Sequence, residues 1–105
     1  MSQFDVYENP SKKSREAYPY IIDVQNALIS DITTRIVIPL GRLSRFRNKQ
    51  MDGLTPIIKY KSEELILLTP QIASIPASLL KNPIGSLETM RDEIIAAIDF
   101  AITGI

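Results

Sequence analysis

The sequence contains no cysteine and no histidine. Without cysteine there is no thiol chemistry and no disulfide, which fits a reducing compartment. The absence of histidine removes the commonest general base near neutral pH, and the two absences together exclude ordinary structural zinc sites. Glycine is also scarce, and neither a glycine-rich phosphate loop nor a Gly-x-Ser-x-Gly elbow is present. We therefore expect a binding protein without cofactor or metal, not an enzyme.

An excess of charge and a long apolar run are missing as well. Twelve basic residues balance twelve acidic ones, so no overall field draws the protein onto nucleic acid, and we expect no direct nucleic-acid binding by the chain alone. No apolar stretch approaches the roughly 20 residues that a membrane-spanning helix needs. The segment Met1–Asp5 lacks a basic region followed by an apolar run, so no signal peptide is expected. These features predict a soluble, cytoplasmic protein.

Residues 1–105 have the length of a single domain, and 45% of them are hydrophobic, which is enough for a core. Period-two alternation and β-branched residues predict a series of short strands. Residues 41–53 are interpreted as a basic, irregular connection, and residues 71–85, which contain Pro76 and Pro83, as turns and extended pieces. The predicted strands cover residues 3–7, 18–25, 34–40, 54–60 and 65–69, the last two joined by a polar turn at residues 61–64.

The last segment has a helical pattern. Ser86 is a suitable N-cap, and Glu88 follows it in the first turn, where the helix dipole favours negative charge. Apolar residues then recur every three or four positions, which predicts an amphipathic helix. The predicted fold is mainly β, of the α+β class: an antiparallel sheet or small barrel with one C-terminal helix. The arc expected to pack on the sheet comprises Ile94, Ile95, Ile98, Ala101, Ile102 and Ile105.

The second half of this helix has few polar residues. Between Ile94 and Ile105 the only charge is Asp99, and Phe100 lies on the outer arc with Ala96 and Thr103. One interpretation is a wide core stripe with Phe100 beneath a loop. The other is that a second chain covers this half, most simply in a homodimer, because a two-fold interface uses one patch twice.

The charged segments offer little sign of catalysis. The basic connection carries Arg42, Arg45, Arg47 and Lys49 around Phe46. It could contact phosphates or an acidic partner, with Phe46 available for stacking, but a solvated loop anchored by Phe46 is the favoured interpretation. The acidic pairs at residues 63–64 and 92–93 fall in a predicted turn and in a first helical turn, where charged residues are ordinary.

The order of segments resembles the CcdB family of toxins from bacterial toxin–antitoxin pairs, along nearly the whole chain. Five short motifs carry the likeness in the right order and spacing. They are Gln3-Phe4-Asp5-Val6-Tyr7, Asp23-Val24-Gln25, Arg35-Ile36-Val37-Ile38-Pro39-Leu40, Ala73-Ser74-Ile75-Pro76, and the final Gly104-Ile105 after an Ile- and Ala-rich helix.

The resemblance implies an SH3-like barrel with a C-terminal helix, a homodimer, and binding to the A subunit of DNA gyrase that traps the enzyme on cleaved DNA. It also implies a CcdA-like antitoxin, whose C-terminal segment is disordered alone and wraps the toxin. The antitoxin would contact either the loop at residues 9–16 or the basic connection. The implied dimer contacts are Phe100, Ala101 and Ile105.

The implied gyrase contacts centre on the end of the helix and on a loop after the second strand. Gly104 and Ile105 match the family's ending, whereas Thr103 stands where its best-known members have tryptophan. An aromatic anchor often dominates interface energy, so this difference bears on the strength of poisoning. The remaining implied contacts are Asp99, in place of an amide, and Asn26 with the apolar pair Leu28 and Ile29 in the loop.

Two other functions stay open. A ribonuclease toxin of the MazF type has a related barrel, and its site would need an arginine, such as Arg35 or Arg45, to converge with an acidic or hydroxyl group. A degenerate relative would keep antitoxin binding and lack the gyrase target.

Overall fold

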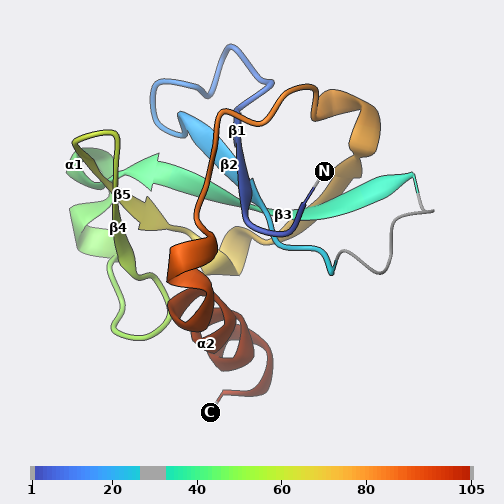
Figure 1. The fold of residues 1–105 in the computed structure, drawn as a ribbon. Coiled ribbons are helices and arrows are strands. Elements are labelled where there is room, and N and C mark those ends of the chain that lie inside the picture. Colours follow the sequence, from blue (N-terminus) through green and yellow to red (C-terminus); the bar gives the residue numbers. More distant parts are fainter. Residues whose placement is uncertain (1, 27–32, 105) are drawn as a thin grey trace.

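The computed structural model describes residues 2–26 and 33–104 (Figure 1). Among these residues the longest helix is α2, at Arg91–Thr103, and the short helix α1 covers Leu43–Phe46. The strands are β1 (Asp5–Glu8), β2 (Tyr20–Asp23), β3 (Thr34–Arg42), β4 (Ile57–Tyr60), β5 (Glu63–Leu67), β6 (Ala73–Pro76) and β7 (Gly85–Ser86). Single 3-10 turns cover Arg47–Lys49, Thr69–Gln71, Ala77–Leu79 and Glu88–Met90.

The strands form one curled antiparallel sheet, ordered β4-β5-β3-β2-β1-β7, and β6 pairs with the first half of β3. Val6, Ile22 and Ile38 lie opposite one another across β1, β2 and β3. All three side chains are completely buried. The neighbouring residues Tyr7, Ile21 and Val37 form a second buried cluster, because successive side chains of a strand point to opposite faces and both faces are covered here.

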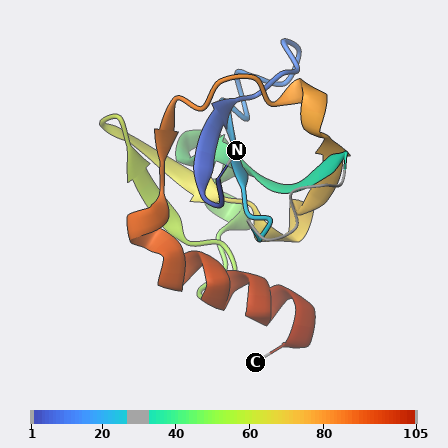
Figure 2. The same ribbon diagram turned by 45° about the vertical axis from the view of Figure 1, so that its right-hand side comes forward.

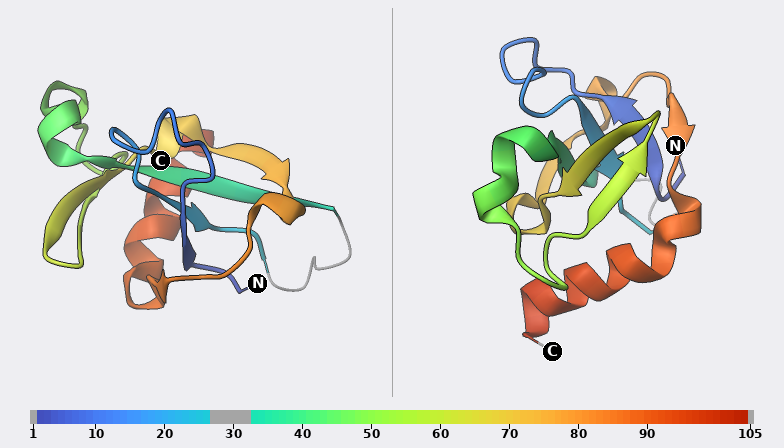
Figure 3. Two further views of the ribbon diagram at one scale, coloured as in Figure 1. Left: turned by 90° about the horizontal axis from the view of Figure 1, so that it is seen from above. Right: turned by 90° about the vertical axis from the view of Figure 1, so that its left-hand side faces the viewer.

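Tyr60 brings the two ends of this sheet together. Its hydroxyl donates to the carbonyl oxygen of Ile84 at 3.3 Å, just before β7. Gly85 leaves room for the Tyr60 hydroxyl, since a Cβ at this position would collide with it. The ring of Tyr20 meets Tyr60 edge-on at 5.3 Å between centroids. The sheet is thereby curled into a half-barrel, which Figure 3 shows with the β4–β5 hairpin turned toward β7. This is the predicted SH3-like barrel with a C-terminal helix.

Helix α2 covers one side of the curled sheet (Figure 2). Ile94 and Ala97 are fully buried in the main core, and Ile95 and Ile98 pack at its margin. The sheet contributes apolar side chains from five strands or their flanks to the same cluster, among them Phe4, Val24, Leu40, Ile58 and Leu65. Burial of one such side chain stabilises the fold by about 1.5–3 kcal/mol. The first half of the helix is therefore held by the core.

Five predicted strands are confirmed, with shifted ends. The first begins at Asp5 rather than Gln3, because Phe4 has a φ of 71°, which is incompatible with an extended strand. The predicted turn at residues 61–64 was too long. Only Lys61 and Ser62 form it, both with positive φ (51° and 64°), as a two-residue hairpin turn of type I′ requires.

The predicted helix start was wrong. Ser86 lies in β7, and a 3-10 turn at Glu88–Met90 intervenes before α2 begins at Arg91. Ser86 still has a capping contact, since its Oγ accepts the Glu88 N–H at 3.2 Å. The main-chain bond from Leu87 N–H to Phe4 C=O, at 2.8 Å, ties this segment to β1. Pairing with β1 therefore delays the helix.

The predicted core arc of the helix was too long. Ala101 is exposed, and Ile102 has 71% of its surface exposed, although both were expected to pack on the sheet. Figures 1 and 2 show why: the last turns of α2 extend past the sheet. The apolar end of the helix is a surface, not core.

Among the described residues, no helix is both long enough and apolar enough to cross a membrane.

Candidate protein-binding site

The last turn of α2 presents Asp99, Thr103 and Gly104 at the surface, all of them exposed. The Thr103 Oγ1 donates to the Asp99 carbonyl oxygen at 2.6 Å, so its polar atom is turned back onto the helix. Gly104 ends the helix with a φ of 75°, and its N–H donates to the Phe100 carbonyl oxygen at 2.9 Å. A left-handed residue at this position is the usual helix end, and glycine adopts it without strain.

The predicted dimer residues Phe100 and Ala101 lie on the same exposed end. Phe100 is 42% exposed, so the ring is only half covered. Its covered edge faces the loop at Gly53, where an added Cβ would stand 3.3 Å from Phe100 Cδ2. The interpretation that a loop lies over Phe100 is therefore correct in part, since the Gly53 loop touches the ring. The interpretation that a second chain covers this half of the helix stays a prediction. Two other exposed apolar residues belong to these segments: Ile102 lies in α2, and Met51 precedes Gly53 in its loop.

Asn26 is the predicted loop residue that the structure describes. Asn26 is exposed just beyond β2. In Figures 1 and 2 the end of β2 and the last turn of α2 are separate parts of the surface. Leu28, Ile29 and Ile105 lie outside the described residues, so their predicted contacts stay predictions.

The basic connection is tied to the body of the protein. Phe46 packs with Leu43, Ile66 and Leu68, and its ring lies 5.2 Å from that of Tyr18. Gly41 permits this packing, because a Cβ there would stand 2.7 Å from the Phe46 ring. Two of the arginines also have carboxylate partners: Arg42 pairs with Glu63 and Arg45 with Glu16. The structure thus favours an anchored loop over a phosphate-binding one.

Arg35 is the least accessible arginine. Its side chain is 4% exposed and that of Asp23 is 0% exposed. Arg35 Nε donates to Asp23 Oδ2 at 2.9 Å, and Nη2 approaches the same oxygen at 2.7 Å. A substrate cannot reach this pair. Of the two arginines suggested for a ribonuclease site, Arg35 is buried and paired with Asp23, and Arg45 is exposed and paired with Glu16. Neither converges with a free acidic or hydroxyl group in the described chain.

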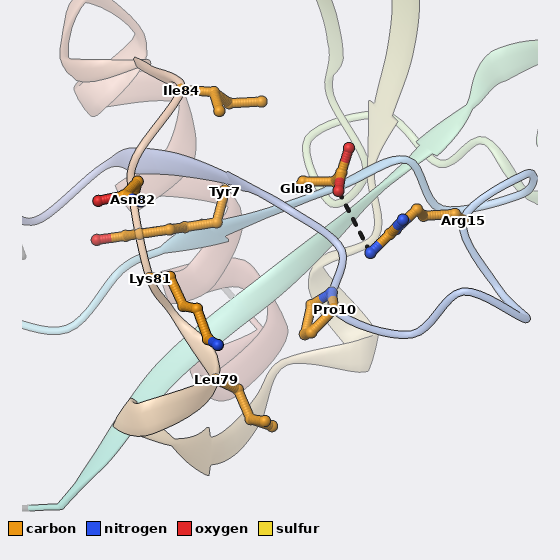
Figure 4. Close-up of a pocket in the computed structure, with 8 residues that line it drawn as sticks. All are labelled: Tyr7, Glu8, Pro10, Arg15, Leu79, Lys81, Asn82 and Ile84. Carbon is orange, nitrogen blue, oxygen red and sulfur yellow. Dashed lines mark ion pairs between the residues drawn. The ribbon is translucent and has the colours of Figure 1, made fainter.

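A hollow of about 400 Å³ adjoins the loop after β1 (Figure 4). Glu8 and Arg15 form an ion pair across one side of it, at 3.3 Å. The loop itself is built around Asn9, whose side chain donates to Ser14 Oγ at 2.9 Å and to the Tyr18 carbonyl oxygen at 2.8 Å. The residues lining the hollow are Tyr7, Glu8, Pro10, Arg15, Leu79, Lys81, Asn82 and Ile84.

Tyr7 lies at the back of this hollow. Its side chain is buried with Ile21, Val37 and Leu80 on the face of the sheet opposite α2. Figure 4 shows the ring beside residues 81–84, with the hydroxyl pointing away from the Glu8–Arg15 pair. That hydroxyl has no hydrogen-bond partner among the described residues. Burial is the main reason why the pKa of Tyr7 is raised above 10.0, and the charges of Asp5 and Asp23 act in the same direction.

This raised pKa predicts a loss of stability at alkaline pH. The unfolded chain releases the tyrosine proton first, so the free energy of unfolding falls as pH rises above 10.0 through the higher folded pKa. Tyr7→Phe should make this fall shallower, and at neutral pH it should be neutral or stabilising, since it removes a buried hydroxyl that lacks a partner. Urea unfolding at a series of pH values measures both effects. An unchanged alkaline slope in Tyr7→Phe would contradict the assignment.

The fold and the exposed helix tip together define a small half-barrel protein with an apolar C-terminal surface. A family of such proteins matches this chain: the CcdB protein family, over residues 3–104. The chain therefore belongs to the CcdB family. Membership makes it a toxin of the toxin–antitoxin type and implies an action on gyrase.

The buried polar group at Asp23, Gln25 and Arg35 was not recognised from the sequence as a structural unit. The available signal was an acidic residue in the apolar run of residues 18–25 and a basic residue in that of residues 34–40. Charged residues are almost never fully buried unless they are paired. That rule could have matched the two residues, although it could not have supplied their geometry.

Proposed function

We propose that this protein is a toxin that binds the A subunit of DNA gyrase through the tip of α2 and stabilises the cleaved enzyme–DNA complex. The observation that carries the proposal is the exposed apolar end of α2 in a chain of the CcdB family. A helix that extends past its own sheet leaves Ile102 and half of Phe100 in water, which is typical of a surface that another protein covers. The protein then acts by binding, without catalysis of its own.

We further propose a homodimer in which Phe100, Ala101 and Ile105 are shared between the two copies. Phe100 and Ala101 are exposed on adjacent positions of α2, and Ile102 next to them is 71% exposed. A two-fold interface would bury this face twice. The helix would then serve two tasks, dimerisation along its side and gyrase binding at its tip.

A CcdA-like antitoxin is the second proposed partner. Of the two regions considered for its contact, the loop at residues 9–16 is better supported, because it borders the hollow beside Leu79 and Ile84. Both of these apolar side chains are exposed. A disordered segment that folds on binding gains affinity from concave, partly apolar surfaces of this kind. The basic connection is less suited to antitoxin binding, because Phe46 is packed on the core and Arg42 and Arg45 are already paired with carboxylates.

A gyrase cleavage assay tests the proposed function. Purified gyrase and supercoiled DNA are incubated with increasing amounts of the protein, and the complexes are denatured to reveal broken DNA. We expect linear DNA to increase with protein concentration, and to remain at background when gyrase is omitted. No increase at high concentration would reject the proposal.

Two parallel measurements separate the other functions. Incubation of the protein with RNA reports sequence-specific cleavage, which would indicate a MazF-type ribonuclease. Titration with the antitoxin, the expected product of a neighbouring gene, would identify a degenerate relative if it binds while gyrase-linked cleavage is absent.

Thr103→Trp should strengthen gyrase poisoning. Threonine supplies little contact area at the helix tip, and its hydroxyl is already bonded to the Asp99 carbonyl oxygen. A tryptophan anchor contributes about 2 kcal/mol or more at an interface, which corresponds to roughly a 30-fold lower concentration for half-maximal cleavage. Thr103→Val, which has the same shape without the hydroxyl, is the matched control and should behave like the wild type. Equal potency of the Trp and Val variants would contradict the predicted role of position 103.

A further inference from the structure

A second pocket, of about 220 Å³, lies between the basic connection and the segment after β5. Three stretches of chain contribute to it: α1 with the turn that follows, the loop at residues 50–56, and the turn Thr69–Gln71. We call it the Phe46 pocket, and its lining comprises Phe46, Lys49, Met51, Thr55, Leu68, Pro70 and Gln71. None of these residues belongs to the surfaces proposed above for gyrase, the second copy or the antitoxin.

Part of the wall of this pocket is apolar and firmly held. Phe46 and Leu68 both pack against Gly41, where an added Cβ would stand 2.7 Å from the Phe46 ring and 3.0 Å from Leu68 Cδ1. The Leu68 N–H donates to the Pro39 carbonyl oxygen at 3.0 Å, and the Leu68 carbonyl oxygen accepts the Gln71 N–H at 2.8 Å. This part of the wall is therefore already formed in the free protein, as in most small-molecule sites.

The loop that completes the pocket is closed by Thr55. The Thr55 Oγ1 accepts the Met51 N–H at 2.7 Å and donates to the Met51 carbonyl oxygen at 3.2 Å. The Thr55 N–H donates to the same carbonyl oxygen at 2.9 Å. Met51 itself is 56% exposed, so a large apolar side chain of the lining remains in water. An apolar ligand would remove part of that surface from water, which favours binding.

Two polar side chains of the lining are not engaged elsewhere in the described chain. Lys49 has no ion-pair partner there, and the side-chain amide of Gln71 has no hydrogen-bond partner there. The lining contains no acidic residue, and Asp52, which follows Met51 in the loop, is not part of it. An ammonium and an amide N–H, without a carboxylate beside them, favour an anionic group over a cationic one.

We propose that the Phe46 pocket binds a small molecule with an apolar body and one carboxylate. The body packs between Phe46, Met51 and Leu68, and the carboxylate accepts hydrogen bonds from Lys49 and Gln71. The pocket is smaller than the roughly 300–1,000 Å³ of drug-sized sites, so the ligand is a short chain or a single ring. This site does not depend on the proposed function, and it adds a binding activity for a small molecule to it.

The probe is octanoate, with octan-1-ol as its neutral counterpart and octylammonium as its cationic one. Each is titrated into the full-length protein while the NMR signals of the Met51 and Leu68 methyl groups are followed. We expect saturable shifts with octanoate, a dissociation constant about threefold or more higher for octan-1-ol, since an exposed ion pair adds only modestly to affinity, and no saturation with octylammonium. Nuclear Overhauser effects between the octanoate chain and the Phe46 ring should place the ligand in the pocket.

Two variants at exposed positions test the assignment of the two halves of the ligand. Lys49→Met removes the ammonium and keeps the length of the side chain, so octanoate should bind it only as well as octan-1-ol does. Lys59→Met, at an exposed lysine of β4, is the control and should keep the preference for octanoate. Met51→Glu places a like charge on the wall and should weaken octanoate binding by about tenfold or more, whereas Leu79→Glu should not.

Equal affinities for octanoate and octan-1-ol, or an unchanged octanoate affinity of Lys49→Met, would overturn the proposed carboxylate contact. Shifts confined to the exposed end of α2, without saturation at Met51, would show that the chains merely adhere to another apolar surface and would overturn the site. The melting temperature of each variant is measured as well. If Met51→Glu does not fold, Lys49→Met and the Overhauser effects to Phe46 decide the outcome.

Discussion

Deletion of Gly104 and Ile105 is expected to abolish gyrase-linked DNA cleavage. The deletion removes the left-handed glycine that turns the chain at the end of α2, together with the apolar residue beyond it. If these residues form the centre of the interface, their loss removes the contacts that carry most of the binding energy. A 100-fold rise in the concentration needed for cleavage corresponds to about 2.7 kcal/mol, and we expect at least this effect. The measurement is the cleavage assay with wild-type and truncated protein side by side.

The deletion also removes a helix-end hydrogen bond, from Gly104 N–H to the Phe100 carbonyl oxygen. Its effect on folding must therefore be measured separately, by circular dichroism and thermal melting. The core contacts of α2 are made by Ile94, Ile95, Ala97 and Ile98, all of them at least six residues before Gly104, so the fold should survive. Leu79→Ser, at an exposed apolar residue of a different segment, is the control and should poison gyrase like the wild type. Full cleavage activity of the truncated protein would show that the helix tip is not the gyrase-binding surface.

Arg35→Met alone is expected to lower the free energy of unfolding by about 3–5 kcal/mol, because it leaves the completely buried Asp23 carboxylate without its partner. Proteins of this size are stable by only about 5–15 kcal/mol, so the variant should lie close to the limit of folding. The shift of the urea unfolding midpoint at constant slope measures the loss.

Two comparisons make the Arg35→Met result specific. Arg42→Met breaks the ion pair with Glu63. The Arg42 side chain is 37% exposed and that of Glu63 is 33% exposed, so this variant should lower the free energy of unfolding by no more than about 1 kcal/mol. Adding Asp23→Leu to Arg35→Met should restore most of the lost stability, since the unpaired charge is then gone. Equal destabilisation by Arg35→Met and Arg42→Met would mean that burial of the first pair has no energetic consequence.

Some features of this fold follow from local patterns in the sequence, whereas others depend on contacts between distant segments. Alternation and β-branched residues in the sequence were sufficient to predict five of the strands, because the period of a strand is a local property of the chain. The three- and four-residue spacing likewise predicted the C-terminal helix. Its low polarity left two interpretations open, a wide core stripe or a surface covered by another chain. The order of five motifs indicated the family, which the match over residues 3–104 establishes.

Other features depend on segments that are distant in the sequence, and the tertiary structure alone decided them. The helix begins late because Leu87 is bonded to Phe4, and it leaves Ala101 and Ile102 exposed because the sheet ends before they are reached. Asp23 and Arg35 became a buried pair only when β2 and β3 were placed side by side. The local pattern of the sequence determined the strands, the helix and the apolar character of its end. The length of the sheet and the pairing of its strands determined which residues of that end are exposed.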